Sequence, residues 1–215
     1  MRKLGLAAVS TLLLGLGACH HDVGTDPGDG TQTLTVNGHV ELEGGGAQVH
    51  VSVRRAGAEV QGAIVTVDSK FGALALTYVG GADYETVQAG WAPGYRITVE
   101  SGEDWLDGSI EAPDLPVLLA PSALTPFDPH LAEGGVVNLE WDGARAMSIK
   151  VETKNFDVTV ADVNKIAVPA TAFEEDQQEI KLERENTTPL AGGTPGSSLD
   201  ARCETKTRVS VLNPF

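Results

Sequence analysis

The chain has 215 residues, of which only two are cysteine, and its formal net charge at pH 7 is −15. Two cysteines cannot build the disulfide framework of a small secreted domain or a thiolate zinc cluster. The acidic balance argues against the clustered Lys and Arg residues that bind nucleic-acid phosphates, so we expect no nucleic-acid partner.

A short basic segment and an apolar run open the chain. Arg2 and Lys3 precede the run 4–18, which is too short to span a bilayer as a permanent helix and is typical of a secretory signal peptide. The run ends in Leu16-Gly17-Ala18-Cys19, which resembles the lipobox of bacterial lipoproteins. The resemblance implies cleavage after residue 18 and lipidation of Cys19, which together give a stable membrane anchor. An ordinary signal peptide, with Cys19 incidental, is the alternative.

The residue after Cys19 indicates to which of the two membranes such a lipoprotein is sorted. In lipoproteins of enteric bacteria an Asp at that position implies retention in the inner membrane, whereas this chain has His20. The resemblance therefore favours the outer membrane, with the periplasmic and exterior faces both open. Residues 19–33 contain Gly, Pro and Asp without apolar periodicity, and we expect a flexible tether there. Its His20-His21 pair is interpreted as linker composition rather than a metal site.

Short apolar alternations with a period of two predict strands through residues 34–114. Glycine-rich turns separate them, a pattern typical of antiparallel sheets packed as a sandwich. The segment 60–67, Val-Gln-Gly-Ala-Ile-Val-Thr-Val, followed by Pro93-Gly-Tyr-Arg-Ile-Thr-Val99, resembles the carboxypeptidase-regulatory or transthyretin-like sandwiches. The expected strands are 34–37, 49–54, 63–68, 74–76 and 95–99.

Prolines between 113 and 129 predict a boundary, because proline cannot donate to a strand ladder. A second series of alternations follows over 115–215, and Val137-Asn-Leu-Glu-Trp141 resembles the strand with a buried Trp in fibronectin type III-like sandwiches. We therefore expect an all-β protein with two Ig-like antiparallel β-sandwich domains in tandem, 34–114 and 115–215. A single larger sandwich domain is the alternative. The second series also predicts a helical turn at Thr171–Glu174 and a long exposed loop over 186–198.

Few residues carry a chemical signature, and we predict no catalytic residue, no cofactor and no metal site. The histidines show no metal-ligand spacing, and His39 and His50 are expected to face solvent. No Gly-x-Ser-x-Gly nucleophile motif occurs. With Cys19 lipidated, Cys203 has no intramolecular partner. It is expected to be buried as a small apolar residue, and an exposed reactive thiol is the alternative.

Three aromatic residues near turns of the first unit are candidate ligand contacts: Trp91, Trp105 and Tyr84. Exposed aromatic rings can stack on sugars or dock a partner protein. The alternative is that these rings cover the ends of the first core. Trp141 alternates with Val137 and Leu139 and is expected in the second core.

The leading functional hypothesis is a membrane-anchored envelope lipoprotein that acts as a non-catalytic binding or structural module. Its expected partners are the membrane, through the lipid on Cys19, and an envelope protein or glycan. A carbohydrate- or peptidoglycan-binding module is the first alternative, and it predicts that Trp91 and Trp105 share one exposed face. An envelope enzyme or its accessory subunit is the second alternative, and it predicts a cleft where His39 and His50 meet carboxylates.

Overall fold

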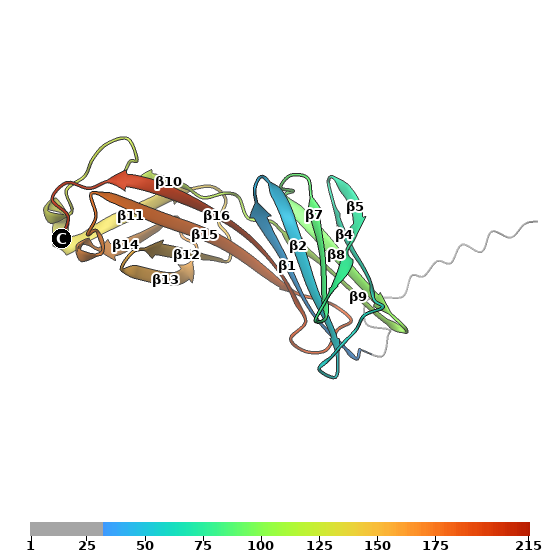
Figure 1. The fold of residues 1–215 in the computed structure, drawn as a ribbon. Coiled ribbons are helices and arrows are strands. Elements are labelled where there is room, and N and C mark those ends of the chain that lie inside the picture. Colours follow the sequence, from blue (N-terminus) through green and yellow to red (C-terminus); the bar gives the residue numbers. More distant parts are fainter. Residues whose placement is uncertain (1–31) are drawn as a thin grey trace, which may run out of the picture.

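The computed structural model describes residues 32–215, and regular structure there is almost entirely β-strand (Figure 1). The predicted signal peptide, Cys19 and most of the predicted tether lie outside the described residues. The prediction of an all-β sandwich fold with antiparallel sheets is confirmed. The helical segments of the described part are short 3-10 turns at Pro129–Leu131, Glu133–Gly135 and Ala170–Ala172. None of the helical segments in residues 32–215 has the length and apolar character needed to cross a bilayer.

Three sheets make up the described fold. The largest has nine strands in the order β13 (Phe156–Ala161), β12 (Ser148–Thr153), β15 (Gln177–Pro189), β16 (Ser198–Ser210), β1 (Leu34–Glu43), β2 (Gly46–Arg55), β7 (Asp83–Gln88) and β6 (Thr77–Gly80), with β3 (Ala58–Glu59) beside β2. A four-stranded sheet contains β5 (Gly72–Ala75), β4 (Ile64–Ser69), β8 (Gly94–Ser101) and β9 (Asp104–Glu111). A three-stranded sheet contains β10 (Val117–Ala120), β11 (Val136–Asp142) and β14 (Lys165–Pro169).

The nine-stranded sheet takes part in two separate cores. One half carries buried residues of β1 and β2 that cluster with those of the four-stranded sheet, which we call the first sandwich. The other half carries buried residues of β12 and β15 that cluster with those of the three-stranded sheet, which we call the second sandwich. Trp141 is 2% exposed in the second core, so its prediction as a core residue is confirmed. Figure 1 shows the two sandwiches as lobes of an elongated molecule.

A long hairpin runs through both sandwiches. Strands β15 and β16 have 13 residues each and pair along their whole length, which corresponds to roughly 40 Å. Ile180 and Leu182 lie in the second core, whereas Leu199 lies in the first. In the first sandwich, β16 pairs with β1 in parallel, in contrast to the antiparallel pairs elsewhere among the named strands. The C-terminal hairpin therefore completes a sandwich whose other strands lie within residues 34–111.

Local sequence patterns account for the turns better than for the long β15–β16 hairpin. Gly44 and Gly45 connect β1 to β2 with positive φ at both positions, the backbone that a two-residue hairpin turn of type I′ requires. The predicted exposed loop over 186–198 is wrong in part, because β15 continues to Pro189 and Leu190 is buried in the first core. One turn does follow Pro169, but it has no side-chain cap hydrogen bond.

The proline-containing connector between β9 and β10 is held to the hairpin by side chains. Proline lacks an N–H, so this segment offers carbonyl groups that need donors from elsewhere. Arg184 Nη1 donates to the carbonyl of Asp114 at 3.1 Å, and Thr205 Oγ1 donates to that of Pro116 at 2.7 Å. Asn186 Nδ2 donates to the carbonyl of Glu111 at 2.8 Å. The connector is therefore fixed against the strands that join the two cores.

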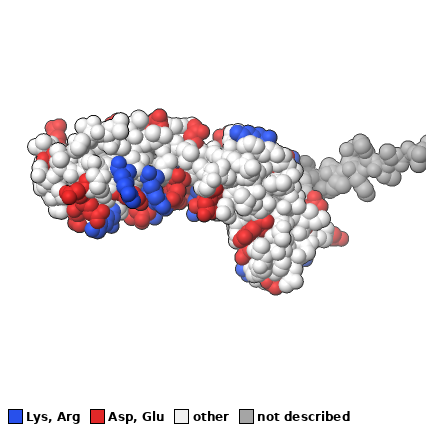
Figure 2. Space-filling view, turned by 45° about the horizontal axis from the view of Figure 1, so that its top comes forward, with Lys and Arg blue, Asp and Glu red and all other residues white. Residues whose placement is uncertain are grey.

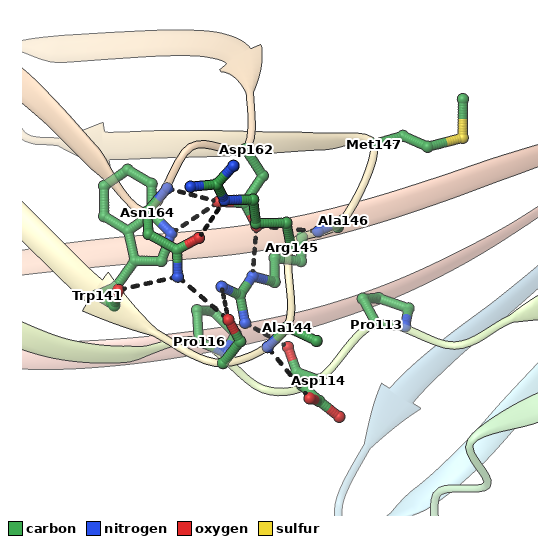
Figure 3. A network of polar contacts seen from close by, with 12 residues as sticks. Pro113, Asp114, Pro116, Trp141, Ala144, Arg145, Ala146, Met147, Asp162 and Asn164 are labelled. Carbon is green, nitrogen blue, oxygen red and sulfur yellow. Dashed lines mark hydrogen bonds and ion pairs between the residues drawn. The ribbon is translucent and has the colours of Figure 1, made fainter.

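A buried ion pair lies at this junction. Arg184 Nε donates to Asp162 Oδ2 at 2.7 Å, and both side chains are fully buried. Asp162 also accepts hydrogen bonds from the Trp141 indole at 2.9 Å and from the backbone N–H groups of Ala146 and Asn164, both at 3.1 Å (Figure 3). Burial alone would raise the pKa of Asp162, but these donors and the Arg184 guanidinium together lower it below its usual value.

Candidate functional site

Four adjacent strands of the nine-stranded sheet place polar side chains in one row on its outer face. Asp200 on β16 is the register partner of His39 on β1, His39 is the partner of His50 on β2, and His50 is the partner of Glu85 on β7. Directly paired residues in a sheet point to the same side, so the four side chains are neighbours. Their chain neighbours of opposite orientation, such as Val49, are buried in the first core. We call these four residues the histidine row.

His39 is held by carboxylates on both ring nitrogens. Nδ1 contacts Asp200 Oδ2, and Nε2 lies 3.3 Å from Glu41 Oε2. The hydrogen bond with Asp200 is the main reason why the pKa of His39 is raised, and Glu41 adds to the effect. Partial burial and the Arg202 guanidinium act in the opposite direction without cancelling it. The imidazolium form of His39 is therefore favoured.

His50 is arranged in the same way on the next strand. Its Nε2 lies 3.3 Å from Asp83 Oδ1, and its Nδ1 lies 3.3 Å from Glu85 Oε1. The two imidazoles share a surface hollow of about 530 Å³. The hollow is lined by His39, Glu41, Glu43, Gln48, Val49, His50, Glu85, Asp200 and Arg202. The prediction that His39 and His50 face solvent agrees with their half-buried places on this face.

This hollow, where His39 and His50 meet carboxylates, has the composition that the enzyme alternative predicts. All four ring nitrogens already face a carboxylate, and the lining residues include no Ser, Thr, Cys, Tyr or Lys that could act as a nucleophile. In the part of the chain that the structure describes, no group of three or more His, Cys, Asp or Glu residues is placed to hold a metal ion. The row can therefore exchange protons and present charge to a ligand.

Substitution Asp200→Asn should lower the pKa of His39, because the main partner of its imidazolium form is lost. In the wild type, a folded-state pKa above the unfolded value of 6.5 contributes stability that is fully present below pH 6.5. That contribution is lost as the pH rises through the raised pKa. NMR titration of the His39 ring should show the lower pKa, and urea unfolding should show a wild-type advantage that shrinks with rising pH. An advantage that instead grows with pH would contradict the assignment.

The three predicted aromatic contacts do not form one surface. Tyr84 is 2% exposed, and its hydroxyl donates to the carbonyl of Val60 at 2.6 Å and accepts from the N–H of Ala63 at 3.0 Å. The Tyr84 ring therefore belongs to the first core, where a ligand could reach it only if the core opened.

Trp91 and Trp105 are both half-buried but lie near opposite ends of the β8–β9 pair. At about 3.3 Å per residue, this separation amounts to roughly 20 Å along the strands. Trp91 donates from Nε1 to the carbonyl of Pro113 at 3.1 Å, and its ring centroid is 5.5 Å from that of Tyr95. Trp91 thus covers one end of the first core, and the two indoles do not form a common stacking platform.

Cys203 is 1% exposed, which confirms the expectation of burial. Its Sγ lies 3.5 Å and 3.4 Å from the carbonyl oxygens of Pro113 and Asp114. Burial raises the pKa of the thiol to about 12. We predict that Cys203 reacts with a disulfide reagent at pH 8 only after denaturant is added, because the thiolate is the reactive form. Fast reaction of the native protein, followed by absorbance, would show that the thiol is accessible.

No protein-family model matches the chain, and no curated protein is significantly similar to it. The sequence pointed to His39 and His50 but missed Asp200 and Glu85. Alternation around Tyr84 could have placed Glu85 on an exposed face, whereas Asp200 joins the row only because β16 pairs with a strand about 160 residues earlier.

Proposed function

We propose that this protein is a lipid-anchored, non-catalytic binding or structural module of a bacterial cell envelope. The observation that carries the proposal is the sequence Leu16-Gly17-Ala18-Cys19 at the end of a basic and then apolar N-terminal segment. His20 in place of Asp favours the outer membrane within the lipoprotein resemblance. The acyl chains on Cys19 are the proposed contact with the membrane.

The contacts made by the first described residues are compatible with attachment of the protein through its N-terminal segment. Thr33 donates from its backbone N–H to Asp104 Oδ1 at 3.0 Å and from Oγ1 to Asp104 Oδ2 at 2.6 Å. Arg55 binds the same carboxylate at 3.0 Å, and Asp104 is 2% exposed. The first described residues are therefore secured directly before β1 begins at Leu34.

The two sandwiches support a role as an extended module. The hairpin strands run unbroken through both cores, and side chains of these strands hold the connector. Such a body can project a binding surface away from its attachment point. The proposal of a non-catalytic role is supported by the lining of the hollow beside the histidine row, which contains no Ser, Thr, Cys, Tyr or Lys.

The anchor can be tested with an alkyne analogue of palmitate in a Gram-negative host that expresses the full chain. Wild-type protein should incorporate the label and sediment with the outer membrane in a density gradient. Cys19→Ser should lose the label and leave the membrane fraction. Cys203→Ser is the matched control, because it removes the other cysteine and should keep both properties. Equal labelling of wild type and Cys19→Ser would overturn the proposal.

A further inference from the structure

Strand β13 is one outer edge of the nine-stranded sheet and pairs with β12 alone among the strands of residues 32–215. Figure 1 shows it at a margin of the second sandwich. The β12–β13 hairpin is closed by the pair Thr153–Phe156, and its register continues without a shift over all six residues of β13. Because hydrogen-bonded and non-hydrogen-bonded pairs alternate from that closing pair, the N–H and C=O groups of Asp157, Thr159 and Ala161 point away from β12. Strand β13 therefore presents a row of backbone donors and acceptors at its outer side.

The side chains on the inward face of β13 are only partly covered. Phe156, Val158 and Val160 pack against the second core but are half-buried. Their neighbours Ile149 and Val151 on β12, which point to the same side, are fully buried. The alternate side chains of β13 are exposed. A strand added beside β13 would therefore gain backbone hydrogen bonds and would also cover apolar surface along the flank of the core.

The other sheet edges of the described chain are protected in the ways that proteins use to prevent pairing with a further strand. Strand β3 has two residues and strands β5, β6 and β10 have four each, and the pairings of β6 and β10 also contain a register shift. Strand β14 carries Lys165 and ends in Pro169, and β9 is covered at Asp107 by two backbone hydrogen bonds with Ala191. By contrast, β13 has six residues with no proline, no lysine and no bulge. It is the edge of the described fold best suited to accept another strand.

The charges beside β13 favour a basic residue on an added strand. Asp157 is the one charged residue of β13, and its side chain is 57% exposed. Lys150 Nζ on β12 lies 3.1 Å from both Asp157 Oδ2 and Glu152 Oε2, so two carboxylates share one lysine. Figure 2 shows blue and red side chains lying together on the second sandwich. A Lys or Arg opposite Asp157 would therefore be attracted and an Asp or Glu repelled, and the net charge of −15 acts in the same direction.

We propose that β13 binds an extended segment of a partner protein by adding it as a strand to the nine-stranded sheet. In an antiparallel arrangement, the partner residues opposite Asp157, Thr159 and Ala161 form the backbone hydrogen bonds and point to solvent. The residues between them cover Val158 and Val160 and are therefore apolar. The segment is thus one in which apolar and polar residues alternate, with a Lys or Arg opposite Asp157. This inference deepens the proposed function, on which it rests for the idea of a binding module, by naming the class of partner.

The test uses the full-length protein in detergent micelles and a synthetic peptide with this pattern, acetyl-Gly-Thr-Val-Thr-Val-Lys-Gly-amide. Two-dimensional NMR should show that the peptide shifts the backbone signals of Asp157, Thr159 and Ala161, and hydrogen exchange of these three amides should become slower. The signals of the other edge strands should not move. No shift at β13, or equal shifts at the other edge strands, would overturn the proposal.

Thr159→Pro removes one outward N–H group and should weaken peptide binding by about tenfold, roughly the effect of one lost hydrogen bond. Proline is tolerated on an edge strand where the missing N–H would face solvent, so the variant should keep the wild-type fold, as its NMR spectrum would show. Thr159→Val is the matched control, because it keeps the N–H group and a β-branched side chain, and it should bind as the wild type does. Normal binding by the folded Thr159→Pro variant would contradict pairing at this edge.

A charge reversal tests the alignment without changing the backbone. A peptide with Glu in place of Lys should bind the wild type about two- to fivefold more weakly, and Asp157→Lys should reverse this preference. A preference that does not reverse would overturn the proposed partner class. Shifts at β13 that grow with protein concentration in the absence of peptide would show that a second copy of the chain takes the edge, and they would overturn it as well.

Failure of this inference is distinguishable from failure of the anchor. Lipidation of Cys19 is measured by palmitate labelling, which does not depend on strand β13. A labelled protein that does not bind the peptide would leave the proposed lipoprotein standing and remove the partner class. A peptide-binding protein without label would do the reverse.

Discussion

Asp162→Ala is expected to lower the free energy of unfolding by about 3–5 kcal/mol, the range found when one partner of a buried ion pair is removed. The substitution leaves the fully buried guanidinium of Arg184 without its carboxylate. It also removes the acceptor of the Trp141 indole N–H and of the Ala146 and Asn164 N–H groups. Since a typical domain is stable by only about 5–15 kcal/mol, the loss should be evident in urea unfolding at 25 °C.

A control with the same contact distance isolates the effect of burial. Arg96 Nη2 lies 2.7 Å from Asp107 Oδ2, as close as Arg184 lies to Asp162, but the Arg96 side chain is 53% exposed. Arg96→Met should change stability by less than about 1 kcal/mol, because solvent screens such pairs. If both substitutions had similar effects, the buried pair would not be what stabilises the junction.

The pH dependence of the wild type gives a second check on Asp162. Its pKa is lowered on folding, so its contribution is present above the ordinary value of 3.8 and is lost as the pH falls through the lowered folded-state value. The difference in stability between wild type and Asp162→Ala should therefore be constant near neutral pH. It should decrease only in strong acid, as followed by circular dichroism in urea at several pH values.

Much of this fold could be predicted because most of its strands alternate between one buried and one exposed face. The alternation in Val49/Val51/Val53 and in Ile149/Val151 shows which face enters a core, without any knowledge of the partner strand. Arg184 continues the inward series of Ile180 and Leu182, so the same periodicity could have marked it as a buried charge in need of a partner. That partner, Asp162, follows the end of β13 and carries no comparable signal.

The pairing of distant strands could not be predicted from local patterns. The parallel pairing of β1 with β16 depends on where the turn of the β15–β16 hairpin packs. From their local sequence alone, Leu190 and Leu199 could be either loop residues or strand residues of the second unit. The candidate site shares this limitation. His39 and His50 are visible as histidines in alternating strands, whereas Asp200 joins them only through the pairing of β1 with β16, which are far apart in the chain.

Gly143→Ala is the second substitution with a large expected effect, about 2–4 kcal/mol of lost stability. Gly143 follows β11 with φ +99°, a backbone conformation that side chains with a Cβ rarely adopt. An added Cβ would overlap Nη1 of Arg184 and lie 3.3 Å from its Cζ. The Gly143 carbonyl also accepts from Arg184 Nη2 at 3.4 Å and from Asn164 Nδ2 at 3.1 Å. The substitution therefore strains the turn and displaces the guanidinium from the connector.

Gly196→Ala separates these two causes. Gly196 has nearly the same φ, +95°, but a Cβ there would meet no atom within 4 Å, so this variant reports the backbone strain alone, about 1 kcal/mol. Urea unfolding of both variants gives the difference that arises from contact with Arg184. The displaced guanidinium should also loosen the Asp114 carbonyl, so limited proteolysis should cut the 113–116 connector faster in Gly143→Ala than in Gly196→Ala. Equal stabilities and equal cutting rates would mean that Arg184 moves aside freely, and the junction would then depend on the hairpin strands rather than on this buried pair.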